Sequence, residues 1–120
     1  MSIQKKSNER LIKLIVYLKK KSHENKAPIW KDVAKRLEKP QQSWAEVNIR
    51  RVAKYTKKGD TVLVPGKLLG SGELLVPVTV AAYSFSESAR DKIRSSGGHS
   101  ISIPELIRRN PKGTGIRIIG

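Results

Sequence analysis

The stretch SFSESARDKIRSSGGHSISIPELIRRNPKGTGIRIIG, residues 84–120, carries the clearest signals of the fold. Ser84, followed three residues later by Glu87, has the form of a capping box and predicts the start of a helix. Gly97 and Gly98 predict its end, because glycine readily adopts the left-handed conformation that other residues resist.

The remainder of this stretch alternates short strands and helices. Residues 100–103 alternate polar and apolar side chains, which is typical of a strand with one buried face. Pro104 suits the first position of a short helix, residues 110–115 are rich in turn formers, and residues 116–119 predict a closing strand. Strand and helix alternate over short distances, which predicts a compact α/β unit.

The residues before this unit predict three helices. Apolar residues at helical spacing predict one helix from Ser7 or Asn8 to about residue 23 and a second from about residue 27 to Pro40. Ser43-Trp44-Ala45-Glu46 has the form of a second capping box and predicts a third helix to about residue 56.

Two strands are expected between the third helix and the closing unit. The first covers residues 61–64 and ends at Pro65-Gly66. The second covers the nearly continuous apolar run at residues 74–83, which is typical of a central strand buried on both faces. Pro77 interrupts this run and predicts an edge or a bulge in its first part.

Length and composition indicate one domain. The chain has 120 residues, of which 38% are hydrophobic, and it has no cysteine for a disulfide or a metal site. No window approaches the roughly 20 apolar residues of a membrane span, and no signal peptide is evident, so a cytoplasmic protein is expected. We interpret residues 1–120 as a single domain with a polar tail at 1–7, a basic helical part at 8–58 and a compact α/β part at 59–120.

The net charge is the strongest compositional signal. Lysine and arginine number 25 against ten acidic residues, which gives a formal charge of +15. Residues 1–60 carry +11 of this charge and residues 61–120 carry +4. Such an excess predicts a polyanionic partner, and nucleic acid is favoured over a membrane because no helix pairs a basic face with a broad apolar one.

The sequence gives little support to catalysis. Its only histidines are His23 and His99, and the ten acidic residues are scattered, so neither a metal site nor an acid–base pair is expected. No serine lies in a nucleophile elbow, and no glycine-rich segment matches a nucleotide-binding loop. We therefore expect no enzyme activity, cofactor, metal or small-molecule substrate.

The best candidate for phosphate binding is the expected third helix, where two arginines and three lysines fall within residues 50–58. The alternative is a merely solvated face. The complete set of residues expected to bind RNA is Arg50, Arg51, Lys54, Lys57, Lys58, Lys67, Arg90, Arg94 and Lys112, followed by Lys19, Lys20 and Lys21.

Glycine loops and aromatic residues give weaker signals. The loops at residues 95–98 and 111–115 leave backbone amides accessible to a phosphate, although ordinary turn chemistry is the favoured explanation; Lys112 favours phosphate contact at the second loop. The six aromatic residues do not form paired stacking strands and are expected to pack in the core.

Several segments, in this order and spacing, resemble the L18e family of large-subunit ribosomal proteins, the archaeal and eukaryotic relatives of bacterial L15. The resemblance covers about residues 8–120 and is carried by Trp30–Ala34, Glu46–Arg51, Val64–Gly70, Val80–Ala82, Phe85–Arg90, Lys92-Ile93, Gly97-Gly98 and Asn110–Gly113.

The resemblance implies a fold and a role. The expected fold is α/β, with N-terminal helices followed by an irregular superhelix of strand-strand-helix units, as in L15 and L18e. The expected role is that of a structural constituent of the large ribosomal subunit, in the cytoplasm, with ribosomal RNA and neighbouring ribosomal proteins as partners. The chain is similar to archaeal members, which lack the basic extensions of other relatives, so its globular surface is expected to make most RNA contacts.

A rival interpretation remains at this point. The second and third expected helices, joined by a short connection at residues 40–43, could form a helix-turn-helix in a free-standing nucleic-acid-binding regulator. The α/β unit would then have no explanation.

Overall fold

The computed structural model describes residues 8–120; the expected polar tail and the possible cap Ser7 lie outside this range. The elements in chain order are α2 (Glu9–Asn25), α3 (Pro28–Glu38), the 3-10 helix η1 (Gln41–Ser43), β1 (Ala45–Asn48), α4 (Ile49–Tyr55), β2 (Thr61–Leu69), β3 (Thr79–Phe85), α5 (Glu87–Ser95), β4 (His99–Ile101), α6 (Ile103–Arg109) and β5 (Ile116–Ile118).

The strands form one sheet in which every pairing is parallel. β2 pairs with β3 along one edge, and β3 pairs in turn with β4. The other edge of β2 is shared, because β5 pairs with its first residues, Thr61–Leu63, and β1 pairs with its last residues, Gly66–Leu69. Parallel neighbours need crossover connections, and α4 and α5 supply them between β1 and β2 and between β3 and β4.

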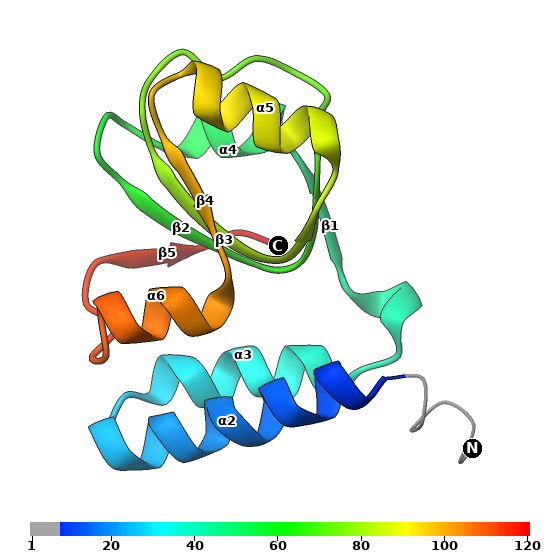
Figure 1. Cartoon of the computed structure of the whole chain (residues 1–120), viewed down its shortest axis with the longest axis vertical. Helices are drawn as coiled ribbons and strands as arrows, with labels where there is room; N and C mark the ends of the chain where they lie inside the picture. Colours follow the sequence, from blue (N-terminus) through cyan, green and yellow to red (C-terminus); the bar gives the residue numbers. More distant parts are fainter. Residues whose placement is uncertain (1–7) are drawn as a thin grey trace.

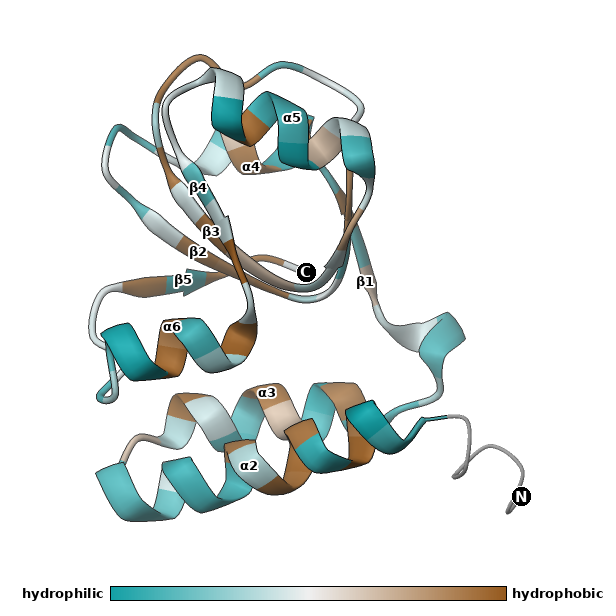
Figure 2. Cartoon of the chain, viewed as in Figure 1, coloured by the Kyte–Doolittle hydropathy of each residue, from teal (hydrophilic) through white to brown (hydrophobic). Residues whose placement is uncertain are grey.

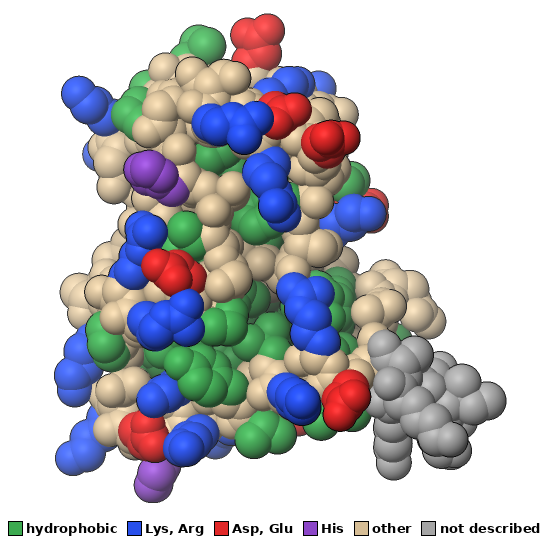
Figure 3. All heavy atoms as spheres, in the orientation of Figure 1, with side chains coloured by type: hydrophobic (Ala, Val, Ile, Leu, Met, Phe, Trp, Pro, Cys, Tyr) green, Lys and Arg blue, Asp and Glu red, His purple; other side chains and the backbone are tan. Residues whose placement is uncertain are grey.

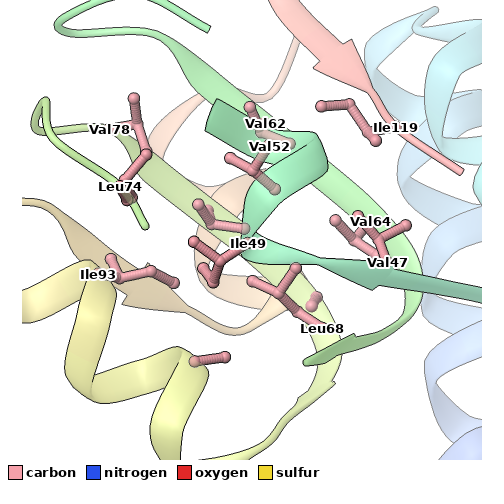
Figure 4. Packing of buried hydrophobic residues seen from close by; sticks show 13 residues of the cluster. Val47, Ile49, Val52, Val62, Val64, Leu68, Leu74, Val78, Ile93 and Ile119 are labelled. Atoms are coloured by element: carbon pink, nitrogen blue, oxygen red, sulfur yellow. The ribbon is translucent and has the colours of Figure 1, made fainter. Parts of the chain in front are cut away.

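Helices cover both faces of this sheet, with α4 and α5 on one side and α6 with the α2–α3 pair on the other (Figure 1). Successive residues of a strand point to opposite faces, so β2 contributes to two cores. Val62 and Val64 pack with Ile49 of α4 and Ile93 of α5, as Figure 4 shows. Leu63 packs in the second core with residues of α2, α3 and α6.

The α/β class expected from the sequence is confirmed. Figure 2 shows hydrophobic residues along β2, β3 and β5, and mixed hydrophobic and hydrophilic residues along the helices that cover them. β2 contributes residues to both cores, and a strand shared in this way joins the two halves of the chain. We therefore propose that the chain forms a single domain.

The first two expected helices are present as α2 and α3. The helical spacing of their apolar residues places Leu18, Val33 and Leu37 in the second core. Trp30 is also fully buried there, and its indole Nε1 donates a hydrogen bond to the carbonyl of Pro111 at 2.8 Å. This bond ties α3 to the turn between α6 and β5.

The expected third helix is wrong in its first half. Ala45–Asn48 forms the strand β1, and α4 begins only at Ile49. Ser43 lies in η1 and not at a helix start, so the apparent capping box does not form. Pairing with Gly66–Leu69 of β2 and burial of Val47 override the local signal, because they satisfy the backbone of this segment and bury its apolar side chain.

The expected strand ends are also corrected. β2 does not stop at Pro65-Gly66 but continues to Leu69 through a shift of register between Val64 and Lys67. Residues 74–78 are not part of β3, which begins at Thr79, after the proline that cannot donate to a ladder.

Two boundaries in the closing unit shift by a few residues. Ser84 does not cap a helix, because it lies in β3 and pairs with Lys67. The cap of α5 is Ser86, whose hydroxyl accepts a hydrogen bond from the Ala89 amide at 3.1 Å. Ile103, expected in a strand, begins α6, which Ser102 caps through the Glu105 amide.

Close backbone approach makes glycine necessary at Gly66. A Cβ atom at this position would lie 2.1 Å from the carbonyl oxygen of Ala45 in the neighbouring strand. The oxygen belongs to the backbone and cannot rotate away as a flexible side chain could. A substitution at Gly66 must therefore push β1 away from β2.

We predict that Gly66→Ala lowers the free energy of unfolding by about 1–3 kcal/mol or more, because the added methyl group overpacks this strand pair. Urea denaturation measures the change. Gly115→Asn is the matched control, since a Cβ at Gly115 meets nothing within 4 Å and asparagine tolerates its φ of +77°. Equal stability of the two variants would contradict the prediction.

Candidate nucleic-acid interface

The described part of the chain offers neither a metal site nor a membrane span. Within residues 8–120 no group of three His, Asp or Glu side chains could hold a metal ion. None of the helices found there is long and apolar enough to cross a bilayer. Figure 3 shows lysine and arginine side chains spread over one face of the molecule.

Five of the expected RNA-binding residues lie together. We call them the α4 cluster: Arg50, Arg51 and Lys54 on α4, with Lys57 and Lys58 in the turn that follows. All five are exposed, and within residues 8–120 none of them forms an ion pair with a carboxylate.

The three α4 residues border a shallow hollow of about 340 Å³ that Glu46, Asn48 and Tyr55 also line. Arg51 and Lys54 lie 5.9 and 5.5 Å from the centre of the Tyr55 ring. Tyr55 is 43% exposed, so the prediction that it packs in the core is wrong. The hollow thus combines three cations with an accessible aromatic ring.

The N-terminus of α4 is held by the loop at residues 70–72. The amide of Arg50 donates to the carbonyl of Ser71 at 2.9 Å, and the amide of Ser71 donates to the side chain of Asn48 at 3.3 Å. Gly72 has a φ of +106°, and a Cβ there would lie 2.6 Å from the Arg50 backbone nitrogen. The loop therefore fits tightly against the helix that carries the α4 cluster.

Lys92 of α5 fixes the other side of this loop. Its ammonium group donates to the carbonyls of Gly70 and Gly72, each at 2.6 Å. The side chain is half-buried and is a structural cation rather than a free one. Sequence reasoning gave Lys92 no role, because nothing in the local pattern shows that it reaches residues about 20 positions earlier.

We predict that Lys92→Met lowers the free energy of unfolding by about 1–3 kcal/mol, since two carbonyls lose a charged donor. Lys35→Met on the exposed side of α3 is the control, because Lys35 has no such bonds among the described residues. Thermal and urea denaturation report both variants. A Lys92→Met protein as stable as the control would show that the two hydrogen bonds of Lys92 do not stabilise the fold.

Three further expected residues are separate from the α4 cluster in sequence and in their contacts. Lys67 of β2 is exposed and borders a hollow beside Trp44 and Tyr83. Arg90 of α5 lies 5.3 Å from the centre of the Phe85 ring. Arg94 is paired with Asp91 at 2.6 Å, so part of its charge is already neutralised.

The remaining expected residues gather near the C-terminal end of α2. Lys112 donates to the carbonyl of Asn25 at 3.1 Å, which places the loop after α6 beside that end. Lys19 pairs with Glu38 at 2.6 Å, and Lys20 and Lys21 lie 4.0 and 3.1 Å from Glu24. Lys19, Lys20 and Lys21 are weaker candidates than the α4 cluster because they already have carboxylate partners.

Both glycine loops have the geometry of tight turns. Gly97 and Gly113 adopt φ values of +88° and +71°, which favour glycine. At Gly113 a Cβ would also clash with the side chain of Ile29. Turn geometry therefore accounts for these glycines. The amides of Gly97, Gly98 and Gly113 already donate to Arg94, Ile93 and Asn110, so phosphate contact stays a prediction only for the other amides of these loops.

Sequence reasoning also missed Arg10, a second cation that the fold positions closely. Arg10 of α2 donates to the carbonyl of Tyr83 at 3.1 Å, and its guanidinium carbon lies 4.4 Å from the centre of the Tyr83 ring. The two residues are 73 positions apart, so no local spacing indicates this contact.

The helix-turn-helix alternative is wrong. η1 and β1 separate α3 from α4, and α4 has only seven residues. A recognition helix that follows a short turn is therefore not formed by these segments.

Comparison with known proteins identifies relatives over nearly the whole chain. Residues 2–119 match the family described as ribosomal protein 60S L18 and 50S L18e. The protein named large ribosomal subunit protein eL18 of Archaeoglobus fulgidus is 51% identical over 115 residues, which cover 96% of this chain and 98% of that protein. Proteins of the same name from Methanoregula boonei and Methanococcus maripaludis are each 50% identical, covering 95% and 94% of this chain and 94% of each relative.

Proposed function

The chain belongs to the ribosomal protein family of 60S L18 and 50S L18e, and from this premise we propose that it binds large-subunit ribosomal RNA through basic helices and glycine-bearing loops. Membership confirms the family resemblance seen in the sequence and places the protein in the large ribosomal subunit, and hence in the cytoplasm. On this proposal its role is structural, and its partners are the RNA and the neighbouring proteins of the subunit.

The observation that carries the proposal is the α4 cluster. Eight ion pairs occur among the described residues, and all of them use cations outside this cluster. Five exposed cations without carboxylate partners repel one another, and phosphate groups would relieve that repulsion. Binding would also release counterions from the RNA, which supplies much of the affinity for a polyanion.

The geometry around the cluster suits a folded RNA better than a short base sequence. α4 is seven residues long and held at its N-terminus, so it presents arginine forks and lysine ammonium groups at fixed places. Guanidinium forks match the oxygens of phosphates. Folded RNA is recognised largely by shape, by phosphates and by 2′-hydroxyl groups, for which no base-reading helix is needed.

Lys67, Arg90 and Lys112 extend the proposed contacts beyond α4. The molecule is flat, with extents of 41 × 31 × 18 Å, and these residues come from β2, α5 and the turn after α6. Exposed cations on several elements favour contacts with more than one RNA segment. Arg94 and Lys19, Lys20 and Lys21 would contribute after exchanging a carboxylate partner for a phosphate.

We predict that Arg50→Ala combined with Arg51→Ala weakens binding to a large-subunit rRNA transcript and flattens its salt dependence by about 1–2 units, as expected for one to two lost phosphate contacts. A filter-binding titration across salt concentrations measures both effects. The matched control is Lys31→Ala with Lys35→Ala, which removes the same charge from exposed positions of α3. An unchanged slope in the arginine variant would remove these residues from the interface.

The role in the subunit has its own test. We predict that the protein in a native extract sediments with the large subunit in stoichiometric amount and stays there after a salt wash that removes loosely bound factors. Gradient sedimentation followed by mass spectrometry measures this. Recovery only at the top of the gradient would contradict the structural role.

A further inference from the structure

A further hollow, distinct from the α4 cluster, lies between α2, the end of β3 and α6. Its volume is about 390 Å³, and its apolar lining comes from Leu14, Ile103 and Pro104 together with the rings of Tyr17 and Tyr83. Arg10, Lys13 and Arg108 also line it. Figure 3 shows hydrophobic atoms in the lower half of this face with Lys and Arg side chains around them.

Arg10 is held against Tyr83 at the edge of this hollow. Its guanidinium lies against the Tyr83 ring at 4.4 Å and donates to the Tyr83 carbonyl at 3.1 Å. The same ring forms a T-shaped pair with Trp44, with 5.0 Å between the ring centroids and 73° between the planes. Two groups of Tyr83, its ring and its carbonyl, thus hold the guanidinium, and Trp44 supports that ring.

Part of this guanidinium stays accessible. Arg10 is exposed and borders not only the hollow beside Tyr17 but also an adjoining one that extends to Phe85 and Arg90. Within the described residues Arg10 has no carboxylate partner. Tyr83 therefore supports one side of the group, and another side is free for a ligand.

The rim favours an anionic ligand. Lys13 and Arg108 stand beside the hollow, and their carboxylate partners are Glu9 at 3.9 Å and Glu105 at 2.8 Å. Hydrogen bonding to Arg108 lowers the pKa of Glu105, and the same bond raises the pKa of Arg108. Both groups are therefore charged at neutral pH, and the unpaired Arg10 gives the rim an excess of positive charge.

We propose that this hollow binds one unstacked nucleotide of a single-stranded rRNA segment. Its base would stack on the guanidinium of Arg10 and lie beside Tyr17, and its phosphate would lie toward Lys13 and Arg108. Flipped-out bases of RNA loops stack on aromatic rings and on guanidinium planes, and this hollow offers both beside cations. The inference rests on the proposed function and adds a base-stacking site to its phosphate contacts.

An apolar segment of another protein is the competing occupant. Such a segment would pack against Leu14, Ile103 and Pro104, but it would need neither the guanidinium plane of Arg10 nor the excess positive charge of the rim. Charge complementarity and the position of the Arg10 guanidinium over the Tyr83 ring favour the nucleotide.

Arg10→Lys tests the stacking directly, since it keeps the charge and removes the plane. The variant is expected to bind an rRNA transcript about 5- to 100-fold more weakly, the range for one lost base stack, with an unchanged salt slope. Arg117→Lys on β5 is the control, because Arg117 is exposed and has no ion-pair or ring partner among the described residues. Tyr17→Leu keeps the apolar bulk, removes the ring and should weaken binding in the same way.

Ultraviolet cross-linking of purified large subunits is the second readout. Mass spectrometry is expected to find a nucleotide adduct on Tyr17 or Tyr83. The nucleotide site is refuted if Arg10→Lys and Tyr17→Leu bind the transcript as tightly as Arg117→Lys and no adduct forms. The proposed function stands in that case, provided that the wild type binds the transcript with its binding weakened by salt. A cross-link from Tyr17 to a protein also refutes it, and a wild type that does not bind RNA refutes both proposals.

Discussion

The structure depends on the two-sided burial of β2. Leu63 belongs to one hydrophobic core, and its neighbours Val62 and Val64 belong to the other, so a shift of this strand by one residue would exchange the two sets. Both edges of β2 pair with other strands, with β3 on one side and with β1 and β5 on the other. This sharing requires the close approach at Gly66, where a side chain would meet the backbone of Ala45.

Positive charge occurs in two different settings on this scaffold. Lys92 is half-buried, and its bonds to two carbonyls hold the loop that supports α4. Arg50 and Arg51 stand on that supported helix without carboxylate partners among the described residues. A lysine that stabilises the fold thus holds in place the arginines proposed to bind RNA, and composition alone cannot distinguish the two kinds of cation.

The sequence predicts those features that arise from neighbours along the chain. The helical spacing in α2 and α3 and the cations at residues 50–58 are local patterns, and the structure shows the helices and groups the cations. The capping box at Ser43 is misleading because the pairing of Val47 with Leu68 decides the conformation there. The contact of Arg10 with Tyr83 joins α2 to β3 and only the completed fold creates it.

The parallel sheet also affects how quickly the chain folds. Its strands cannot pair through tight hairpins, and Thr61 must find both Thr79 and Ile116 before β2 is enclosed. Such distant pairings are slow to form, and until they do the +15 charge repels itself across an open chain. A polyanion that screens this charge would therefore speed the collapse of the protein, so the RNA proposed as its partner would act on folding as well as on the folded state.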